Sequence, residues 1–216
     1  MRTFLFPIFL FVVLECAANS APVSEADLKS LLAAIRQNRT TQADFQEERV
    51  IRLMKKPVLS SGTVWFQPPN KFRREVKSNS PSLTVSDGRQ LWIYYPNFKS
   101  AERYPLGKGS PLDSTVAAIN SSLNLEDVEN TFQIAAAKTG SGYELRLLPR
   151  GPMKRVFQKL DLLINDQLRV ERTDMLLLNG DRIVTTYSNQ TRAPVPGSMF
   201  QFTPPPGTDV STPLGK

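Results

Sequence analysis

After Thr41, apolar residues alternate with polar ones along most of the chain, and short runs of turn-forming residues interrupt the alternation. Successive side chains of a β-strand point to opposite faces of a sheet, so this pattern predicts strands that each bury one face. The interruptions are mostly short, which favours hairpins and antiparallel pairing over helical crossovers. The chain is therefore expected to fold around an antiparallel meander.

About ten runs are long enough to be strands. They are residues 43–53, 62–67, 70–76, 82–86, 90–95, 132–138, 143–148, 156–164, 168–174 and 182–189. Asp87-Gly88 separates two of them and is a dipeptide typical of tight hairpin turns. Residues 199–203 lie between two proline-rich runs and are predicted to form a short extended segment at a sheet edge, because proline cannot donate to a ladder.

Two segments carry helical patterns instead. Ser24 with Asp27 three residues later resembles a capping box, and it precedes a stripe of Leu28, Leu31, Leu32 and Ile35. Residues 111–123 predict a second helix, with a stripe of Val116, Ile119 and Leu123. The expected fold is mainly β (α+β), with one strongly bent antiparallel sheet or incomplete barrel and helices over its hollow side. Residues 21–216 show no internal linker and are read as a single domain.

The first 20 residues have the features of an export signal. Arg2 gives a positive start, residues 4–14 are apolar, and Ala18-Asn19-Ser20 offers a cleavage site. We expect residues 1–20 to be removed and the mature protein to be soluble in a periplasm. The alternative is a lipoprotein signal with acylated Cys16, although Glu15 stands where that processing site normally needs a small residue.

The composition excludes several kinds of catalytic site. The chain has no histidine, and Cys16 is its one cysteine. A Ser-His-Asp triad and a His-ligated zinc are therefore impossible, and the mature chain has no thiol. Glu47 and Glu48 do not make a pair of catalytic acids, because adjacent strand residues face opposite ways. Motifs for phosphate or dinucleotide binding are missing, so no cofactor and no metal are expected.

The formal net charge is +7, and basic residues cluster at Lys55-Lys56, at residues 71–74 and at residues 99–108. A basic surface can meet anionic lipid headgroups, acidic proteins or nucleic acid. Nucleic acid is a poor candidate for an exported chain without a recognised binding motif. A solvated face that keeps the protein soluble is the simplest alternative.

Apolar side chains that alternate along the predicted strands are expected to line one face of the sheet. They are Phe45, Val64, Phe66, Phe72, Val76, Leu83, Val85, Leu91, Ile93, Leu145 and Leu147. Trp65, Trp92 and Tyr94 are then expected outside or at the rim, although a slip of one residue would exchange them for Leu91 and Ile93. The pattern leaves open whether the helices cover a cavity or a solid core, and solid packing is the usual case.

Five segments, in this order, resemble the periplasmic outer-membrane lipoprotein carrier family (LolA-like). They are residues 27–30 (DLKS), 45–46 (FQ), 62–73 (GTVWFQPPNKFR), 85–96 (VSDGRQLWIYYP) and 202–207 (FTPPPG). The combination of the fourth segment with the last is the most specific part of the resemblance. It spans the mature chain from the first helix to the last strand.

The resemblance implies an unclosed barrel with helices as a lid over an apolar cavity. It also implies a carrier, not an enzyme, that takes acylated lipoproteins from an inner-membrane ABC-type release complex to an outer-membrane acceptor lipoprotein, as a monomer. The side chains then expected to contact acyl chains come from both helices and the sheet. They are Leu28, Leu31, Leu32, Ile35, Phe45, Val64, Phe66, Phe72, Leu83, Val85, Leu91, Ile93, Val116, Ile119 and Leu123.

The chain departs from the family at the lid contact. The family has an arginine before the Pro-Asn of the turn near residue 70, which bonds the lid and holds it shut when the carrier is empty. Pro68 stands at that position here, and Arg74 stands where the family usually has tryptophan. Our hypothesis is that Arg74 or Arg73 replaces the missing lid contact. The alternative is that Arg74 lies at the rim and apolar packing alone holds the lid.

Three other functions remain open from the sequence. In the first, the chain carries another lipid, such as a glycolipid or polyene intermediate. In the second, it is an outer-membrane-anchored acceptor lipoprotein, which requires an acylated Cys16. In the third, it is a periplasmic regulatory or structural interaction module with a filled core.

Overall fold

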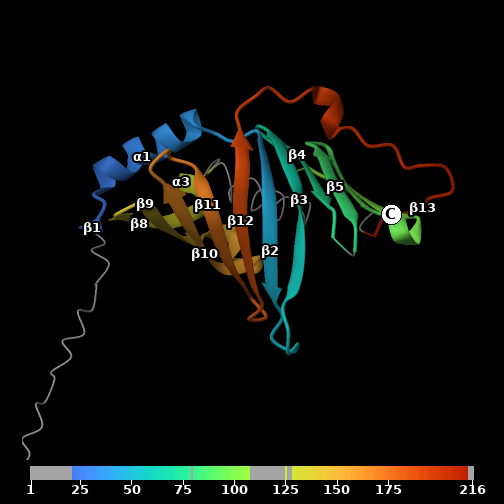
Figure 1. The fold of residues 1–216 in the computed structure, drawn as a ribbon, viewed down its shortest axis with the longest axis horizontal. Coiled ribbons are helices and arrows are strands. Elements are labelled where there is room, and N and C mark those ends of the chain that lie inside the picture. Colours follow the sequence, from blue (N-terminus) through green and yellow to red (C-terminus); the bar gives the residue numbers. More distant parts are fainter. Residues whose placement is uncertain (1–20, 79, 108–124, 126–127, 214–216) are drawn as a thin grey trace, which may run out of the picture.

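Thirteen strands in a single sheet make up most of the structure (Figure 1), a computed structural model that describes residues 21–78, 80–107, 125 and 128–213. The strands are β1 (Ala21–Pro22), β2 (Gln42–Val50), β3 (Val58–Gln67), β4 (Lys71–Val76), β5 (Ser82–Asp87), β6 (Gln90–Tyr95), β7 (Ser100–Pro105), β8 (Phe132–Thr139), β9 (Gly142–Pro149), β10 (Phe157–Asn165), β11 (Val170–Leu177), β12 (Arg182–Thr191) and β13 (Asp209–Ser211). The helices are α1 (Glu25–Gln37), α3 (Val128–Thr131) and three 3₁₀ helices, Pro96–Phe98, Gly151–Arg155 and Gly197–Phe200.

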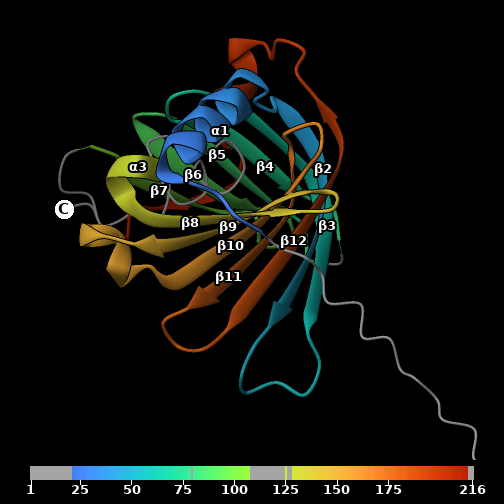
Figure 2. The ribbon, with the colours of Figure 1, turned by 90° about the vertical axis from the view of Figure 1, so that its left-hand side faces the viewer.

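Two antiparallel meanders are joined into this sheet. Strands β2 to β7 form one meander and β8 to β12 the other, and β12 pairs antiparallel with β2. The edges are β1, which pairs with β8, and β13, which runs parallel to β7. The sheet curls strongly but does not close (Figure 2). This confirms the predicted mainly β fold with one curved, unclosed antiparallel sheet.

The predicted strands recur with shifted ends, and the predicted hairpin at Asp87-Gly88 is present. Asp87 Oδ1 accepts hydrogen bonds from the backbone N–H groups of Arg89 and Gln90, both at 2.7 Å, and Gly88 has a φ of 89°. Strand β7 was not predicted. The prediction for residues 199–203 was wrong, because Met199 and Phe200 lie in a 3₁₀ helix and the edge strand is β13.

Helix α1 begins as predicted. Ser24 is its N-cap and accepts a hydrogen bond from the backbone of Asp27 at 3.2 Å, while Leu31, Leu32 and Ile35 are buried. Its far end is tied to α3 by an ion pair between Arg36 and Glu129. Burial acts to raise the pKa of Glu129, but the hydrogen bond from Arg36, a backbone hydrogen bond and the charge of Arg36 together outweigh it, so the pKa lies below its usual value. The pair therefore helps to hold α1 at neutral pH.

Several predictions fall outside the described residues. They concern the signal segment 1–20 with Cys16, and the second helix over residues 111–123 with Val116, Ile119 and Leu123. In the part of the chain that is described, no helix is long and apolar enough to cross a membrane.

Candidate functional site

One face of the sheet, here called the inner face, packs against α1. Directly paired residues share a face, and the register groups Phe66, Phe72 and Leu91 on this one. They belong to a single apolar cluster with Leu31, Leu32 and Ile35 of α1. The cluster also includes Leu145 and Leu147 of β9, so apolar side chains from both meanders pack together with the helix, as the alternation predicted.

Most sequence-predicted contact residues lie in or beside this cluster. Leu31, Leu32, Ile35, Phe45, Val64, Phe66, Phe72 and Leu91 are buried members, and Leu28 packs against it half-buried. Ile93 is opposite Thr84, in the same row of the ladder as Val64, and so also lies on the inner face. Trp65, Trp92 and Tyr94 lie on the opposite face, as predicted.

The expectation that Leu83 and Val85 share this face was wrong. Val85 is paired with Arg73 and Trp92, and Leu83 with Glu75 and Tyr94, which places both on the opposite, outer face. Val85 is nevertheless buried. The C-terminal segment lies over this part of the outer face, where the Phe202 ring contacts Trp92 and Tyr94 with centroids 5.6 and 5.4 Å apart.

The second meander supplies inner-face residues that were not named as candidate contacts. Phe132 and Phe157 stack with ring centroids 5.9 Å apart, and Leu160, Leu162 and Ile164 are buried in the same cluster. The signal was present, because Leu160, Leu162 and Ile164 alternate along β10 as Leu145 and Leu147 do along β9.

A polar pair interrupts the apolar inner face. Arg74 lies between Val64 and Thr84 in the ladder, donates from Nη2 to Glu47 Oε2 at 2.8 Å, and places its guanidinium 4.2 Å from the centroid of the Phe45 ring. The side chains of Arg74 and Glu47 are 25% and 23% exposed. A half-buried cation with a carboxylate and an aromatic face against it is well stabilised. Arg74 is therefore held on the inner face of the sheet.

Arg73 cannot take the same role. It lies on the outer face, forms an ion pair with Glu75 at 2.6 Å, and donates to the backbone carbonyl of Met199 at 3.3 Å. Its side chain thus fixes the C-terminal segment. The prediction that Arg73 contacts a lid over the inner face was wrong, because neighbouring residues of a strand point to opposite faces.

A hollow of about 450 Å³ opens between α1 and β8. Leu28 and Leu32 line it from the helix, and Phe132, Ile134 and Ala136 line it from the strand. Charged side chains also line it, among them Lys29 and Arg150. Its volume is within the range of small-molecule sites, about 300–1,000 Å³. The hollow therefore lies along the edge of the apolar cluster beside α1, where Leu32 and Phe132 are each 1% exposed.

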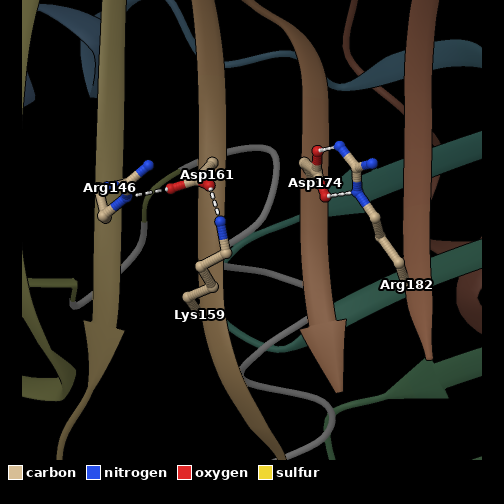
Figure 3. Close-up of polar contacts among 5 residues, drawn as sticks. All are labelled: Arg146, Lys159, Asp161, Asp174 and Arg182. Atoms are coloured by element: carbon tan, nitrogen blue, oxygen red, sulfur yellow. Dashed lines mark hydrogen bonds and ion pairs between the residues drawn. The ribbon is translucent and has the colours of Figure 1, made fainter. Parts of the chain in front are cut away.

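The outer face of β9 to β12 is polar by contrast (Figure 3). Asp161 accepts from Arg146 at 2.7 Å and from Lys159 at 2.6 Å, and Arg182 Nε donates to Asp174 at 2.6 Å. Burial acts to raise the pKa of Asp161, but its two cationic partners outweigh it and keep the pKa below its usual value. These charges are paired with one another on the sheet. The inner face, with its buried apolar cluster, is the candidate site for an apolar ligand.

The described residues contain no candidate metal site. Within the described ranges, no three Asp, Glu, Cys or His side chains gather where they could hold a metal ion.

Comparison with known proteins identifies the family. The family model "Outer membrane lipoprotein carrier protein LolA" matches residues 36–203. The chain belongs to the LolA family. It is 30% identical over 203 residues to the outer-membrane lipoprotein carrier protein of Dechloromonas aromatica, covering 93% of this chain and 92% of that protein. The protein of the same name from Chromobacterium violaceum is 30% identical over 209 residues, with 93% and 97% covered.

A solved structure agrees with the fold of the LolA-family chain. An uncharacterized conserved protein from Thermus thermophilus superposes with a TM-score of 0.53 at 14% identity, covering 86% of this chain and 99% of that one. At this identity the likeness concerns the fold alone.

Proposed function

We propose that the protein is a carrier that binds the acyl chains of lipoproteins against its inner face and delivers them to an outer membrane. The observation that carries this proposal is the apolar cluster shared by α1 and the inner face, with a hollow along its edge beside α1. Membership of the LolA family supports the same function. The names of the relatives supply the cargo class, outer-membrane lipoproteins.

The physics of the cargo explains why a carrier is needed. Each methylene exposed to water costs about 0.8 kcal/mol, so one acyl chain of about sixteen carbons costs roughly 12 kcal/mol. An acylated protein therefore does not cross an aqueous compartment unescorted. The carrier must bury the chain and later release it, which requires an empty state of similar free energy to the loaded state.

We place the carrier in a periplasm, as a monomer that receives cargo from an inner-membrane ABC-type release complex and passes it to an outer-membrane acceptor lipoprotein. The export signal predicted for residues 1–20 and the family support this route. A carrier needs no catalytic group, and a sequence without histidine is consistent with a protein that is not an enzyme.

Purification of the protein from its native periplasm, followed by mass spectrometry of what it carries, tests the proposed function. We expect acylated lipoproteins to copurify in stoichiometric amount. A glycolipid or polyene in their place would identify a different cargo for the same site. A protein that carries no hydrophobic molecule and takes up no fluorescent fatty acid would contradict a carrier role.

We expect Arg74→Leu to slow the transfer of bound lipoprotein to the outer-membrane acceptor by about tenfold. In the structure Arg74 donates to Glu47. We propose that it also contacts the lid in the empty, closed state, where a charged hydrogen bond contributes about 1.5–3 kcal/mol. Without that contact, cargo binding meets less competition and release slows. The measurement is the rate at which labelled lipoprotein leaves the carrier in the presence of acceptor-containing membranes.

Arg73→Leu is the matched control for Arg74→Leu, because it removes the neighbouring guanidinium from the outer face. It should leave the transfer rate unchanged. Equal rates for Arg74→Leu and the unmodified protein would remove Arg74 from the release mechanism and leave apolar packing to hold the lid.

A further inference from the structure

The hairpin between β2 and β3 projects beyond the rest of the sheet in both views (Figures 1 and 2). We call residues 50–59 the hairpin tip. The turn between β11 and β12 lies beside it, since the backbone N–H of Arg52 donates to Asp181 Oδ1 at 3.1 Å. Leu178 belongs to that adjoining turn. These two segments form one end of the molecule.

Exposed apolar side chains gather at this end. Leu53 is 95% exposed, Leu59 69% and Met54 52%. Among the residues that the structure describes, nine large apolar side chains are exposed, and six of them are at this end: Val50, Leu53, Met54, Val58, Leu59 and Leu178. Exposed apolar side chains scattered singly need no explanation, but a group of them marks an interaction surface.

The same segment is strongly basic. Arg49, Arg52, Lys55 and Lys56 lie in or next to the hairpin tip, and no acidic residue occurs between Glu48 and Glu75. Arg52, Lys55 and Lys56 are exposed. Basic side chains with long aliphatic stems can keep their charges in a headgroup layer while neighbouring apolar groups lie deeper.

The base of the hairpin tip is held in place. Besides the bond to Arg52, Asp181 lies 3.9 Å from the guanidinium of Arg49, and Asp181 itself is buried. Eight residue pairs, from Gln42 opposite Trp65 to Arg49 opposite Val58, form the ladder that runs into the base of the tip. The apolar side chains are therefore presented on a supported projection.

We propose that the hairpin tip, together with Leu178, inserts shallowly into the surface of an anionic lipid bilayer. The argument for lipid over a protein partner is the shape and chemistry of the surface. A convex projection with flexible Leu, Met and Lys side chains and no aromatic anchor is unlike the Trp-, Tyr- and Arg-rich centres of protein interfaces. It suits a fluid, negatively charged surface, where each basic residue and each buried apolar group adds to binding.

This docking has a consequence for orientation. In both Figure 1 and Figure 2, α1 lies toward the top of the molecule and the hairpin tip lies at its bottom. A protein bound by its hairpin tip therefore directs α1 and the hollow beside it away from the lipid, where another protein can reach them. The inference holds whatever molecule the inner face binds.

Cosedimentation of the mature chain, residues 21–216, with vesicles of equal parts phosphatidylglycerol and phosphatidylcholine tests the proposal. We expect binding that weakens strongly as salt is raised, because the Debye length falls to about 3 Å at 1 M. L53Q/M54Q, which removes apolar groups, and K55Q/K56Q, which removes charges, should each weaken binding at least tenfold. The exposed positions leave folding intact, which the circular dichroism of each variant checks.

Controls of the same chemistry lie elsewhere on the surface. Phe98→Gln removes an 80% exposed aromatic side chain, and K154Q/R155Q removes two exposed basic residues of the 3₁₀ helix Gly151–Arg155. Both should bind vesicles like the unmodified protein. Equal loss in the controls, equal binding to pure phosphatidylcholine, or unchanged binding by either hairpin variant would overturn the proposal. So would self-association through the tip without vesicle binding, which would assign this surface to a second copy of the chain.

Discussion

Replacing Phe72 with alanine is expected to lower the free energy of unfolding by about 3–5 kcal/mol. The Phe72 side chain is 0% exposed on the inner face and belongs to the cluster shared with α1. Truncation loses the transfer free energy of the ring and leaves a void that dense surroundings refill poorly. Urea denaturation followed by the tryptophan fluorescence of Trp65 and Trp92 measures the change.

Phe98→Ala is the matched control, because the same ring is removed at an 80% exposed position, and its effect should stay within about 0.5 kcal/mol. The comparison also distinguishes two views of the inner face. If Phe72 faced an empty acyl-sized cavity, its truncation would cost little stability and would enlarge the cavity. A loss below about 1 kcal/mol would therefore argue against packed side chains here and for a standing cavity.

The fold was largely predictable because period-two alternation and turn residues are local signals. A strand is predicted from its own sequence once one of its faces is recognised as apolar, and short turns join consecutive strands into hairpins. Strand β7 was not predicted from the sequence because Glu102, Arg103 and Pro105 break the apolar alternation in this segment, which lies near the sheet edge. Strand β13 follows a proline-rich stretch and pairs with β7 through its backbone, which no side-chain pattern records.

The candidate site was predicted less completely, because alternation identifies two faces without saying which one turns inward. For Leu91 and Ile93 the assumption that apolar means inner was correct. For Leu83 and Val85 it failed, because the outer face here is also covered, by the segment that includes Phe200 and Phe202. When a strand has apolar residues on both faces, its own sequence does not show which face is the inner one.

The position of Arg74 depends on contacts that are far apart in the sequence. Its partners Glu47 and Phe45 come from β2, and Gly62 of the intervening β3 lies opposite Phe45. A Cβ at Gly62 would lie 1.7 Å from the backbone carbonyl oxygen of Glu75 and 3.1 Å from the Phe45 ring, so the close approach of β4 requires a glycine here. The glycine admits the neighbouring β4 backbone and also leaves room for the ring on which Arg74 stacks, a relation among three strands that spacing alone does not reveal.

Leu28→Gln is expected to weaken the binding of a fluorescent fatty acid by about tenfold or more. Leu28 is half-buried on the α1 stripe and lines the hollow between α1 and β8. An acyl chain there contacts the side chain, and an unpaired amide against hydrocarbon costs about 1–3 kcal/mol, each 1.4 kcal/mol being a factor of ten in affinity. Leucine and glutamine have similar helix propensities, so α1 itself should persist. Fluorescence titration with the probe gives the dissociation constants.

Ala33→Gln introduces the same side chain on the same helix at an exposed position, away from the buried stripe. It should leave the affinity unchanged, and circular dichroism should show equal helix content in the two variants. Equal affinities for Leu28→Gln and Ala33→Gln would mean that acyl chains do not enter beside α1. Saturable binding that survives both substitutions would then direct attention to the opposite rim of the inner face, where Ile93 and Tyr104 lie.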